Sequence, residues 1–275
     1  MRRLTQPGPV HPVRIDICPG TLEPLRFTLR AGLSLTEALT GPLVEAGFRS
    51  ATVVVKGGAL SPFRYVMPGP AASAAHVAYF TAPRAPDGIT RIEQANATFG
   101  WSDGKPMLHC HAAWVEPDGQ RRGGHILPGD SIVCEETAVE AWGFRDIAVA
   151  TEPDPETNFT LLQPRGTSAT GNAVFARVKP NEDIVQAVET IAAAHEMPNG
   201  TVRGSLGSLI GARFTDGSGV DDHATEVLIR HGRLRDGKAD LDLLVVDMKG
   251  AVHEGRLIPG ENPVCITFDL VLERA

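Results

Sequence analysis

The sequence lacks the segments that mark membrane, secreted and disulfide-stapled proteins. None of its 275 residues belongs to a run approaching 18 apolar residues, so no membrane-spanning helix is expected. The first residues include Arg2 and Arg3, but no apolar segment follows them, so no signal peptide is expected either. The four cysteines are widely separated and form no CxxC pair, which argues against a disulfide framework and a cysteine-built zinc site. These absences favour a cytoplasmic location.

The sequence also lacks the basic stretch that a DNA-binding surface usually needs. Lys and Arg number 26 against 33 Asp and Glu, which gives a net charge of −7. Residues 1–150 carry 14 basic and 14 acidic residues, whereas residues 151–275 carry 12 and 19. The excess negative charge therefore lies in the second half, and basic residues occur together only in short pairs such as Arg121 and Arg122. Direct nucleic-acid binding is accordingly not expected.

What the sequence does contain is an internal repeat. A shift of 131 residues places residues 109–134 over residues 240–265 without a gap, and seven of the 26 columns are identical. The matched columns include turn glycines such as Gly119 and Gly250, as a shared backbone would require. We therefore predict a tandem duplication, with one unit at residues 14–145 and a second at residues 174–275. The linker between the units is taken as residues 146–173, and within it residues 151–173 read as a connector with at most one short strand, at residues 159–162.

Each unit is expected to be an α+β fold with a mainly antiparallel sheet and few helices. Strands are predicted at residues 26–30 and 174–178, each followed by a helix. In the second unit Asp183 is a suitable N-cap, and the apolar residues that follow it recur with helical spacing. The remainder of each unit consists of short β runs broken by glycine and proline.

Three histidines are predicted to meet on one hairpin. Residues 107–115 read as a strand, so His109 and His111 share one face. The following Pro117-Asp118-Gly119 suits a three-residue loop, which would place His125 directly opposite His111. A two-residue turn would instead move His125 to the other face of the sheet.

Three converging imidazoles are the ligand set of zinc sites that keep a fourth position open. We therefore predict that His109, His111 and His125 bind Zn²⁺ or another divalent metal. The alternative is that they are polar residues on an exposed face or hydrogen-bonding groups in a subunit contact. In the second unit their equivalents are Asp240, Asp242 and Arg256, so an Asp242–Arg256 ion pair is expected to replace the ligand set there.

The segment that holds these histidines resembles a known family. The order LHCH, a DG turn, GGHILPG and a β run is similar to the plant and prokaryote conserved (PPC) domain, also called DUF296. The resemblance implies an α+β fold that associates as trimers, with the histidine cluster near subunit contacts. It also implies protein association, and relatives are often described as DNA-binding. No Arg-Gly-Arg-Pro AT-hook occurs here, and the second unit departs from the pattern at all three histidine positions.

Two classes of function remain open from the sequence. The first is a metal-dependent hydrolase or lyase that acts on a small molecule. The acidic residues nearest in sequence, Glu135, Glu136 and Glu140, are candidate general bases in that case, unless they are solvent-facing strand residues. The second is a non-catalytic regulatory or protein-interaction module. In both cases the chain is expected to form a homo-oligomer, a trimer or a multiple of one.

Overall fold

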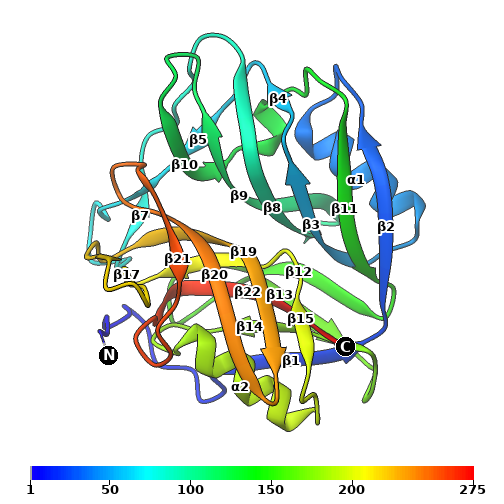
Figure 1. The fold of residues 1–275 in the computed structure, drawn as a ribbon, viewed down its shortest axis with the longest axis vertical. Helices are drawn as coiled ribbons and strands as arrows, with labels where there is room; N and C mark the ends of the chain where they lie inside the picture. Colours follow the sequence, from blue (N-terminus) through cyan, green and yellow to red (C-terminus); the bar gives the residue numbers. More distant parts are fainter. Residues whose placement is uncertain (1) are drawn as a thin grey trace.

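Two large β-sheets lie face to face in the computed structural model, which describes residues 2–275 (Figure 1). The first half of the chain builds most of the upper sheet in this view, and the second half builds most of the lower sheet. The described residues include two α-helices, one in each half: α1 (Leu35–Glu45) and α2 (Ile184–Ala194). The predicted α+β fold, with mainly antiparallel sheets and few helices, is confirmed. Neither helix is long and apolar enough to cross a membrane.

The first sheet has ten strands, and its main path runs in the order β2-β11-β3-β8-β9-β10-β5. Its ladders are antiparallel, except that β12 meets β8 in parallel at Ala150 and Trp101. The strands are β2 (Leu22–Leu29), β3 (Ser50–Lys56), β4 (Ala59–Leu60), β5 (Tyr65–Val66), β8 (Thr90–Ser102), β9 (Lys105–Val115), β10 (Arg121–Ile126), β11 (Thr137–Phe144), β12 (Ile147–Pro153) and β13 (Thr160–Gly166).

The second sheet has eight strands, seven of them in the order β1-β14-β22-β15-β19-β20-β21. Its strands are β1 (Ile15–Gly20), β14 (Ala173–Val178), β15 (Gly200–Val202), β16 (Leu206–Leu209), β19 (Thr225–Arg235), β20 (Lys238–Val246), β21 (Val252–Arg256) and β22 (Val264–Arg274). Two short hairpins and one 3-10 turn complete the fold, namely β6 (Pro68–Gly69) with β7 (Tyr79–Phe80), β17 (Ala212–Arg213) with β18 (Gly219–Val220), and η1 (Pro128–Asp130).

Local sequence explains where the two helices begin. The Ser34 hydroxyl accepts a hydrogen bond from the backbone N–H of Glu37, and the Glu37 carboxylate accepts one from the Ser34 N–H, which forms a capping box. Asp183 caps α2, as predicted, by accepting a hydrogen bond from the Gln186 N–H at 2.9 Å. Each helix packs its apolar residues into the core of its own half.

The connection between the halves differs from the sequence prediction. Residues 146–173 contain two strands, β12 and β13, which pair with each other and join the first sheet. The expectation of a connector with at most one short strand was therefore wrong. In addition, β1 lies in the second sheet beside β14, although it begins the predicted first unit. The start of the chain thus contributes a strand to the second sheet. The predicted unit boundaries remain a prediction.

The inner faces of the two sheets pack directly on each other. Ala113 of β9 lies in an apolar cluster with Leu206, Leu228 and Leu244 of the second half. Beside it, the buried amide of Asn96 donates hydrogen bonds to the backbone carbonyls of Ser205 and Ile229. This contact positions the candidate site, because the histidines lie on the same face of β9 and β10.

Candidate metal centre

The loop between β9 and β10 has the predicted length and shape. The Glu116 N–H donates a hydrogen bond to the Gln120 carbonyl at 2.9 Å, and the Gly119 N–H donates one to the Glu116 carbonyl, also at 2.9 Å. Gly119 has φ of 82°, the left-handed conformation that favours glycine at this position. With this three-residue loop, His125 pairs with His111 across the hairpin. The alternative two-residue turn does not occur.

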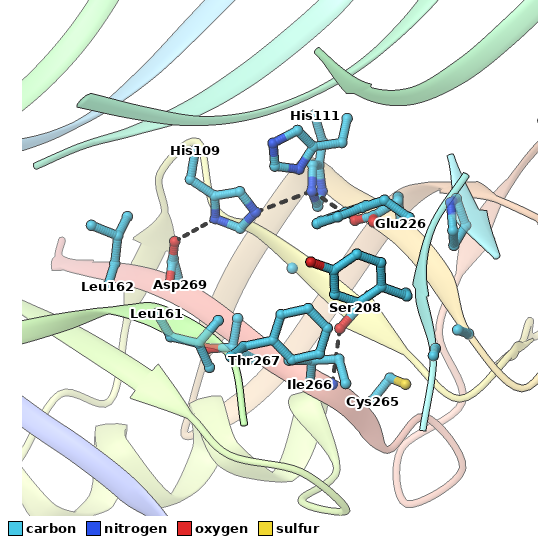
Figure 2. A pocket seen from close by; sticks show the side chains of 18 of the residues that line it. His109, His111, Leu161, Leu162, Ser208, Glu226, Cys265, Ile266, Thr267 and Asp269 are labelled. Atoms are coloured by element: carbon cyan, nitrogen blue, oxygen red, sulfur yellow. Dashed lines mark hydrogen bonds and ion pairs between the residues drawn. The ribbon is translucent and has the colours of Figure 1, made fainter. Parts of the chain in front are cut away.

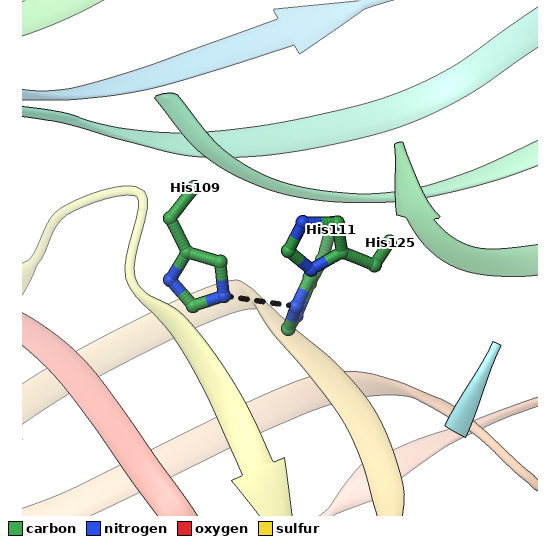
Figure 3. A group of neighbouring side chains, drawn as sticks. All are labelled: His109, His111 and His125. Atoms are coloured by element: carbon green, nitrogen blue, oxygen red, sulfur yellow. Dashed lines mark hydrogen bonds between the residues drawn. The ribbon is translucent and has the colours of Figure 1, made fainter. Parts of the chain in front are cut away.

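The three histidines converge as predicted. Figure 2 shows His109 and His111 pointing toward the second sheet, and Figure 3 shows His125 beside them. Their ring centroids are 4.7 to 5.3 Å apart. The Nε2 atoms of His109 and His111 are 3.1 Å apart, and one nitrogen from each of the three rings lies within 4.8 Å of the others.

The second half of the chain holds two of these rings in place. The Nδ1 atom of His109 lies 2.9 Å from the carboxylate Oδ2 of Asp269 on β22. The Nδ1 atom of His111 lies 3.0 Å from the carbonyl oxygen of Val227 on β19. Because a carbonyl oxygen and a carboxylate can only accept, each Nδ1 must carry the hydrogen. The Nε2 atoms of His109 and His111 are therefore directed at the space between the rings.

Glu226 on β19 is the second carboxylate at the cluster. Its Oε2 atom lies 2.7 Å from Nε2 of His111, and both side chains are almost completely buried. Burial alone would lower the pKa of His111, but the carboxylate of Glu226 outweighs it, and the pKa of His111 lies above its ordinary value. The protonated form of His111 is therefore stabilised by its contact with the Glu226 carboxylate.

His125 has the opposite electrostatic environment. Burial, together with the neighbouring His111 and His109, lowers the pKa of His125 well below its ordinary value. Its ring is accordingly neutral near pH 7. The buried Nδ1 atom of His125 has no hydrogen-bond partner among residues 2–275. A buried nitrogen without a hydrogen-bond partner destabilises the folded state. Its position beside two other imidazoles therefore indicates a binding site for a ligand.

The donor set fits a zinc ion. Zinc binds imidazole nitrogen at roughly 2.0–2.1 Å in tetrahedral geometry, which places two ligand nitrogens roughly 3.3 Å apart. The separation of 3.1 Å between Nε2 of His109 and Nε2 of His111 is close to that value. The contact between His109 and Asp269 also matches the carboxylate–histidine pairs that orient metal ligands in proteins.

The cluster forms one wall of a cavity of about 190 Å³ between the two sheets (Figure 2). Residues of β6 and β7 and of the segment that leads into β13 also line it. Side chains that line it include Tyr79, Phe80, Met107, Phe159, Leu161, Leu162, Ser208, Ile266 and Thr267, together with the histidines, Glu226 and Asp269.

The acidic residues proposed from the sequence do not lie at this site. Glu135 forms an ion pair with Arg91, Glu140 forms one with Arg26, and Glu136 is exposed. None of the three lines the cavity: Glu140 lies on β11, which is separated from β9 by β3 and β8, and Glu135 and Glu136 lie in the segment just before β11. Nearness in sequence was therefore a poor guide to the general base.

The carboxylates that do meet the cluster come from the other half of the chain. Glu226 and Asp269 each stand within an otherwise apolar strand segment, and both are buried. A charged residue in such a segment is rarely buried without a partner. That pattern was the signal that could have identified them.

The second hairpin repeats the backbone of the first but not its predicted ion pair. Asp242 lies opposite Arg256 as expected. Its carboxylate, however, pairs with Arg230 of β19 at 2.9 Å, while Arg256 pairs with Asp240 at 3.3 Å. The register of β19 shifts between Ile229 and His231, which brings Arg230 to Asp242. The predicted Asp242–Arg256 pair is corrected accordingly.

The solved structures to which this chain is similar each match about half of it. A metal-containing protein from Archaeoglobus fulgidus is 19% identical, with a TM-score of 0.41, and the match covers 54% of this chain and 97% of that one. A PPC protein from Pyrococcus horikoshii is 13% identical, with a TM-score of 0.42 and coverage of 57% and 99%. A protein from Ralstonia eutropha JMP134 that is proposed to bind DNA is 19% identical, with a TM-score of 0.37 and coverage of 50% and 89%.

A comparison of the sequence with protein-family models identifies one domain within the chain. None of the curated proteins compared with this chain matches it. Residues 18–141, however, match the family model of the Plants and Prokaryotes Conserved (PCC) domain, the family that the histidine segment resembles. This range holds the whole β9–β10 hairpin and all three histidines. Residues 18–141 of this chain therefore form a Plants and Prokaryotes Conserved domain.

Proposed function

We propose that His109, His111 and His125 bind a zinc ion, and that the cavity beside them hydrolyses or cleaves a small molecule. The observation that carries this proposal is the buried, unpaired Nδ1 atom of His125 next to the facing Nε2 atoms of His109 and His111. Three neutral imidazoles without a fourth protein ligand form the ligand set of catalytic zinc sites.

The surrounding residues have definite roles in this proposal. Zinc, when bound, supplies Lewis acidity that polarises a carbonyl group or activates a water molecule. Asp269 and the Val227 carbonyl hold His109 and His111 with Nε2 directed at the ion. His111 must lose its Nε2 proton to bind a metal, and Glu226 lies 2.7 Å away to accept it. Once that proton has been released to solvent, the Glu226 carboxylate is placed to act as general base and then, when protonated, as general acid.

Metal analysis of three proteins tests the zinc site. We expect about one zinc per chain in the wild type after purification without chelator and reloading. His125→Ala should lose the ion, because it removes one of three ligands. Asp240→Ala should keep it, because Asp240 is the second-half equivalent of His109 and lies outside the cluster. A wild type that stays metal-free after reloading overturns the proposal.

A second candidate function rests on a different observation. His109 and His111 already contact Asp269, Glu226 and Val227, which join the two halves without any metal. The cluster could thus serve as a structural joint in a regulatory or protein-interaction module. A substitution of His125 distinguishes the two candidate functions, because its Nδ1 atom makes no hydrogen bond with residues 2–275 that the substitution would remove. A metal-free joint predicts that His125→Ala changes the melting temperature by the same amount in the presence and absence of zinc, since only packing is lost.

We further propose that the chain forms a homo-oligomer, a trimer or a multiple of one, as its family resemblance implies. Part of the inner face of the first sheet is left uncovered by the second half, around Arg26, Thr28 and Glu140. Analytical ultracentrifugation tests this proposal, since a single species of monomer mass over a wide concentration range contradicts it.

A further inference from the structure

We propose that the cavity takes an uncharged molecule with one aromatic ring that carries a carbonyl group, such as a simple aromatic amide or ester. The ring would lie among the aromatic side chains at the mouth, and the carbonyl would point toward the histidines. The position of the carbonyl rests on the proposed zinc site, whereas the choice of a neutral ring rests on the cavity walls alone.

The walls favour a ring because they are mainly apolar and aromatic. Tyr79 and Phe159 stack with ring centroids 5.5 Å apart, and Phe80 lies edge-on to His125 at 5.1 Å. Tyr79 and Phe80 are 48% and 38% exposed, although both are large apolar groups. Partly exposed aromatic residues around a cavity are typical of sites that gain binding energy by covering a ring.

The charges at the site disfavour an anion. No lysine or arginine is among the residues that line the cavity, whereas Glu226 and Asp269 are. A divalent ion bound by neutral histidines would be balanced in charge by these two carboxylates. The nearest buried cation, Arg177, is paired with Asp154 at 2.6 Å. A phosphate or carboxylate group on the ligand would therefore have no cationic side chain in the cavity to compensate its lost hydration.

Two hydroxyl groups can bind a neutral oxygen. The Ser208 hydroxyl accepts a hydrogen bond from the Ile266 N–H at 3.0 Å, and the Thr267 hydroxyl accepts one from Nε of Arg177 at 3.0 Å. Neither hydroxyl donates to a protein acceptor among residues 2–275. Each can therefore donate to an oxygen atom of a ligand.

The cavity is large enough for one aromatic ring with a short substituent. Its volume is about 190 Å³. A protein cavity of roughly 150 Å³ holds a benzene molecule. The remaining space accommodates a short substituent such as an amide.

The preference for a neutral ring can be tested without metal. Ligand-observed NMR on the metal-free protein would compare benzamide, acetamide and 4-carbamoylbenzoate. We expect benzamide to bind at least about tenfold more tightly than either of the others, because only it buries a ring without burying a charge. Phe159→Ala should remove this preference, and Ile89→Ala, a change at an exposed residue outside the cavity, should keep it. Equal binding of the three compounds, or no binding of benzamide, overturns the inference.

The zinc-loaded protein then tests where the carbonyl group lies. Calorimetry would compare benzohydroxamic acid with acetohydroxamic acid, since both carry a zinc-binding group and only one carries a ring. We expect the aromatic compound to bind at least about tenfold more tightly, with the difference lost in Phe159→Ala. If zinc binds but the two compounds bind equally, the ligand class is wrong and the metal site stands. If no zinc binds while benzamide is still preferred, the metal site is wrong and the ligand class stands.

Discussion

At the scale of single residues, the site depends on hydrogen bonds that fix which nitrogen of each histidine faces its neighbours. Asp269 accepts the Nδ1 hydrogen of His109, and the Val227 carbonyl accepts that of His111. Without these acceptors either ring could place its hydrogen on Nε2 and lose its lone pair there. Asp269 and Val227 are therefore positioning residues rather than metal ligands.

Asp269→Asn should weaken zinc binding without abolishing it. The amide can still contact Nδ1 of His109, but it carries no charge and can present N–H in place of oxygen, which would favour the wrong tautomer. Loss of such an outer carboxylate typically costs about 10- to 100-fold in metal affinity. Competition with a chromophoric chelator measures the dissociation constant.

The matched control for this change is Asp240→Asn in the second hairpin. Asp240 is exposed and pairs with Arg256, away from the cluster. Its substitution should leave zinc affinity unaltered. Equal affinities for Asp269→Asn and the wild type would show that Asp269 does not orient His109.

At the scale of elements, the β9–β10 hairpin could be predicted because residues close together in the sequence determine its loop and its register. Pro117, Asp118 and Gly119 specify the loop, the loop specifies the register, and the register brings His125 opposite His111. The second hairpin repeats this loop, with a hydrogen bond of 3.1 Å from the Asp247 N–H to the Ala251 carbonyl. The ion pairs of that hairpin could not be predicted in the same way, because a shift in a third strand decides them.

β10 also has to lie close to the second half, and Gly123 permits this. A Cβ atom at Gly123 would meet the side chain of Val246 and lie 2.9 Å from the Ala112 carbonyl oxygen. We expect Gly123→Ala to lower the free energy of unfolding by about 1–3 kcal/mol, the usual cost of overpacking. Urea denaturation measures the change.

Gly129→Ala provides the comparison for Gly123→Ala. A Cβ atom there meets only the Thr36 hydroxyl oxygen, at 3.9 Å, and Gly129 is not among the glycines of positive φ. This variant should keep the stability of the wild type to within about 0.5 kcal/mol. Wild-type stability in both variants would mean that the two halves are not closely packed at β10.

At the scale of the whole molecule, contacts between distant parts of the chain could not be predicted from local patterns. His109 and Asp269 are separated by 160 residues, and their meeting depends on the packing of two complete sheets. The same holds for β1, which pairs with β14 across the chain, and for the pairing of β12 with β13. Periodicity identifies a strand, but it does not specify which distant strand lies beside it.

A buried ion pair adds to the connection between the halves and makes stability depend on pH. Asp154, which follows β12, pairs with Arg177 of β14 at 2.6 Å, and both side chains are buried. Burial alone would raise the pKa of Asp154, but Arg177 and hydrogen bonds from Thr157 outweigh it, so the pKa lies below its ordinary value of 3.8. The carboxylate therefore stabilises the fold above the pKa of the unfolded chain, and this contribution is lost as the pH falls through the folded value.

Asp154→Asn should accordingly lower the free energy of unfolding by about 3–5 kcal/mol at pH 7, because it leaves the Arg177 charge buried without a partner. The difference from the wild type should narrow as the pH falls below about 4, where the Asp154 carboxyl of the unfolded chain begins to gain a proton while that of the folded protein stays ionised to lower pH. Urea denaturation at a series of pH values measures both quantities, with Asp87→Asn, a change at an exposed residue, as the control. A difference that stays constant from pH 7 to pH 3 would show that the Asp154 charge does not stabilise the junction between the two sheets.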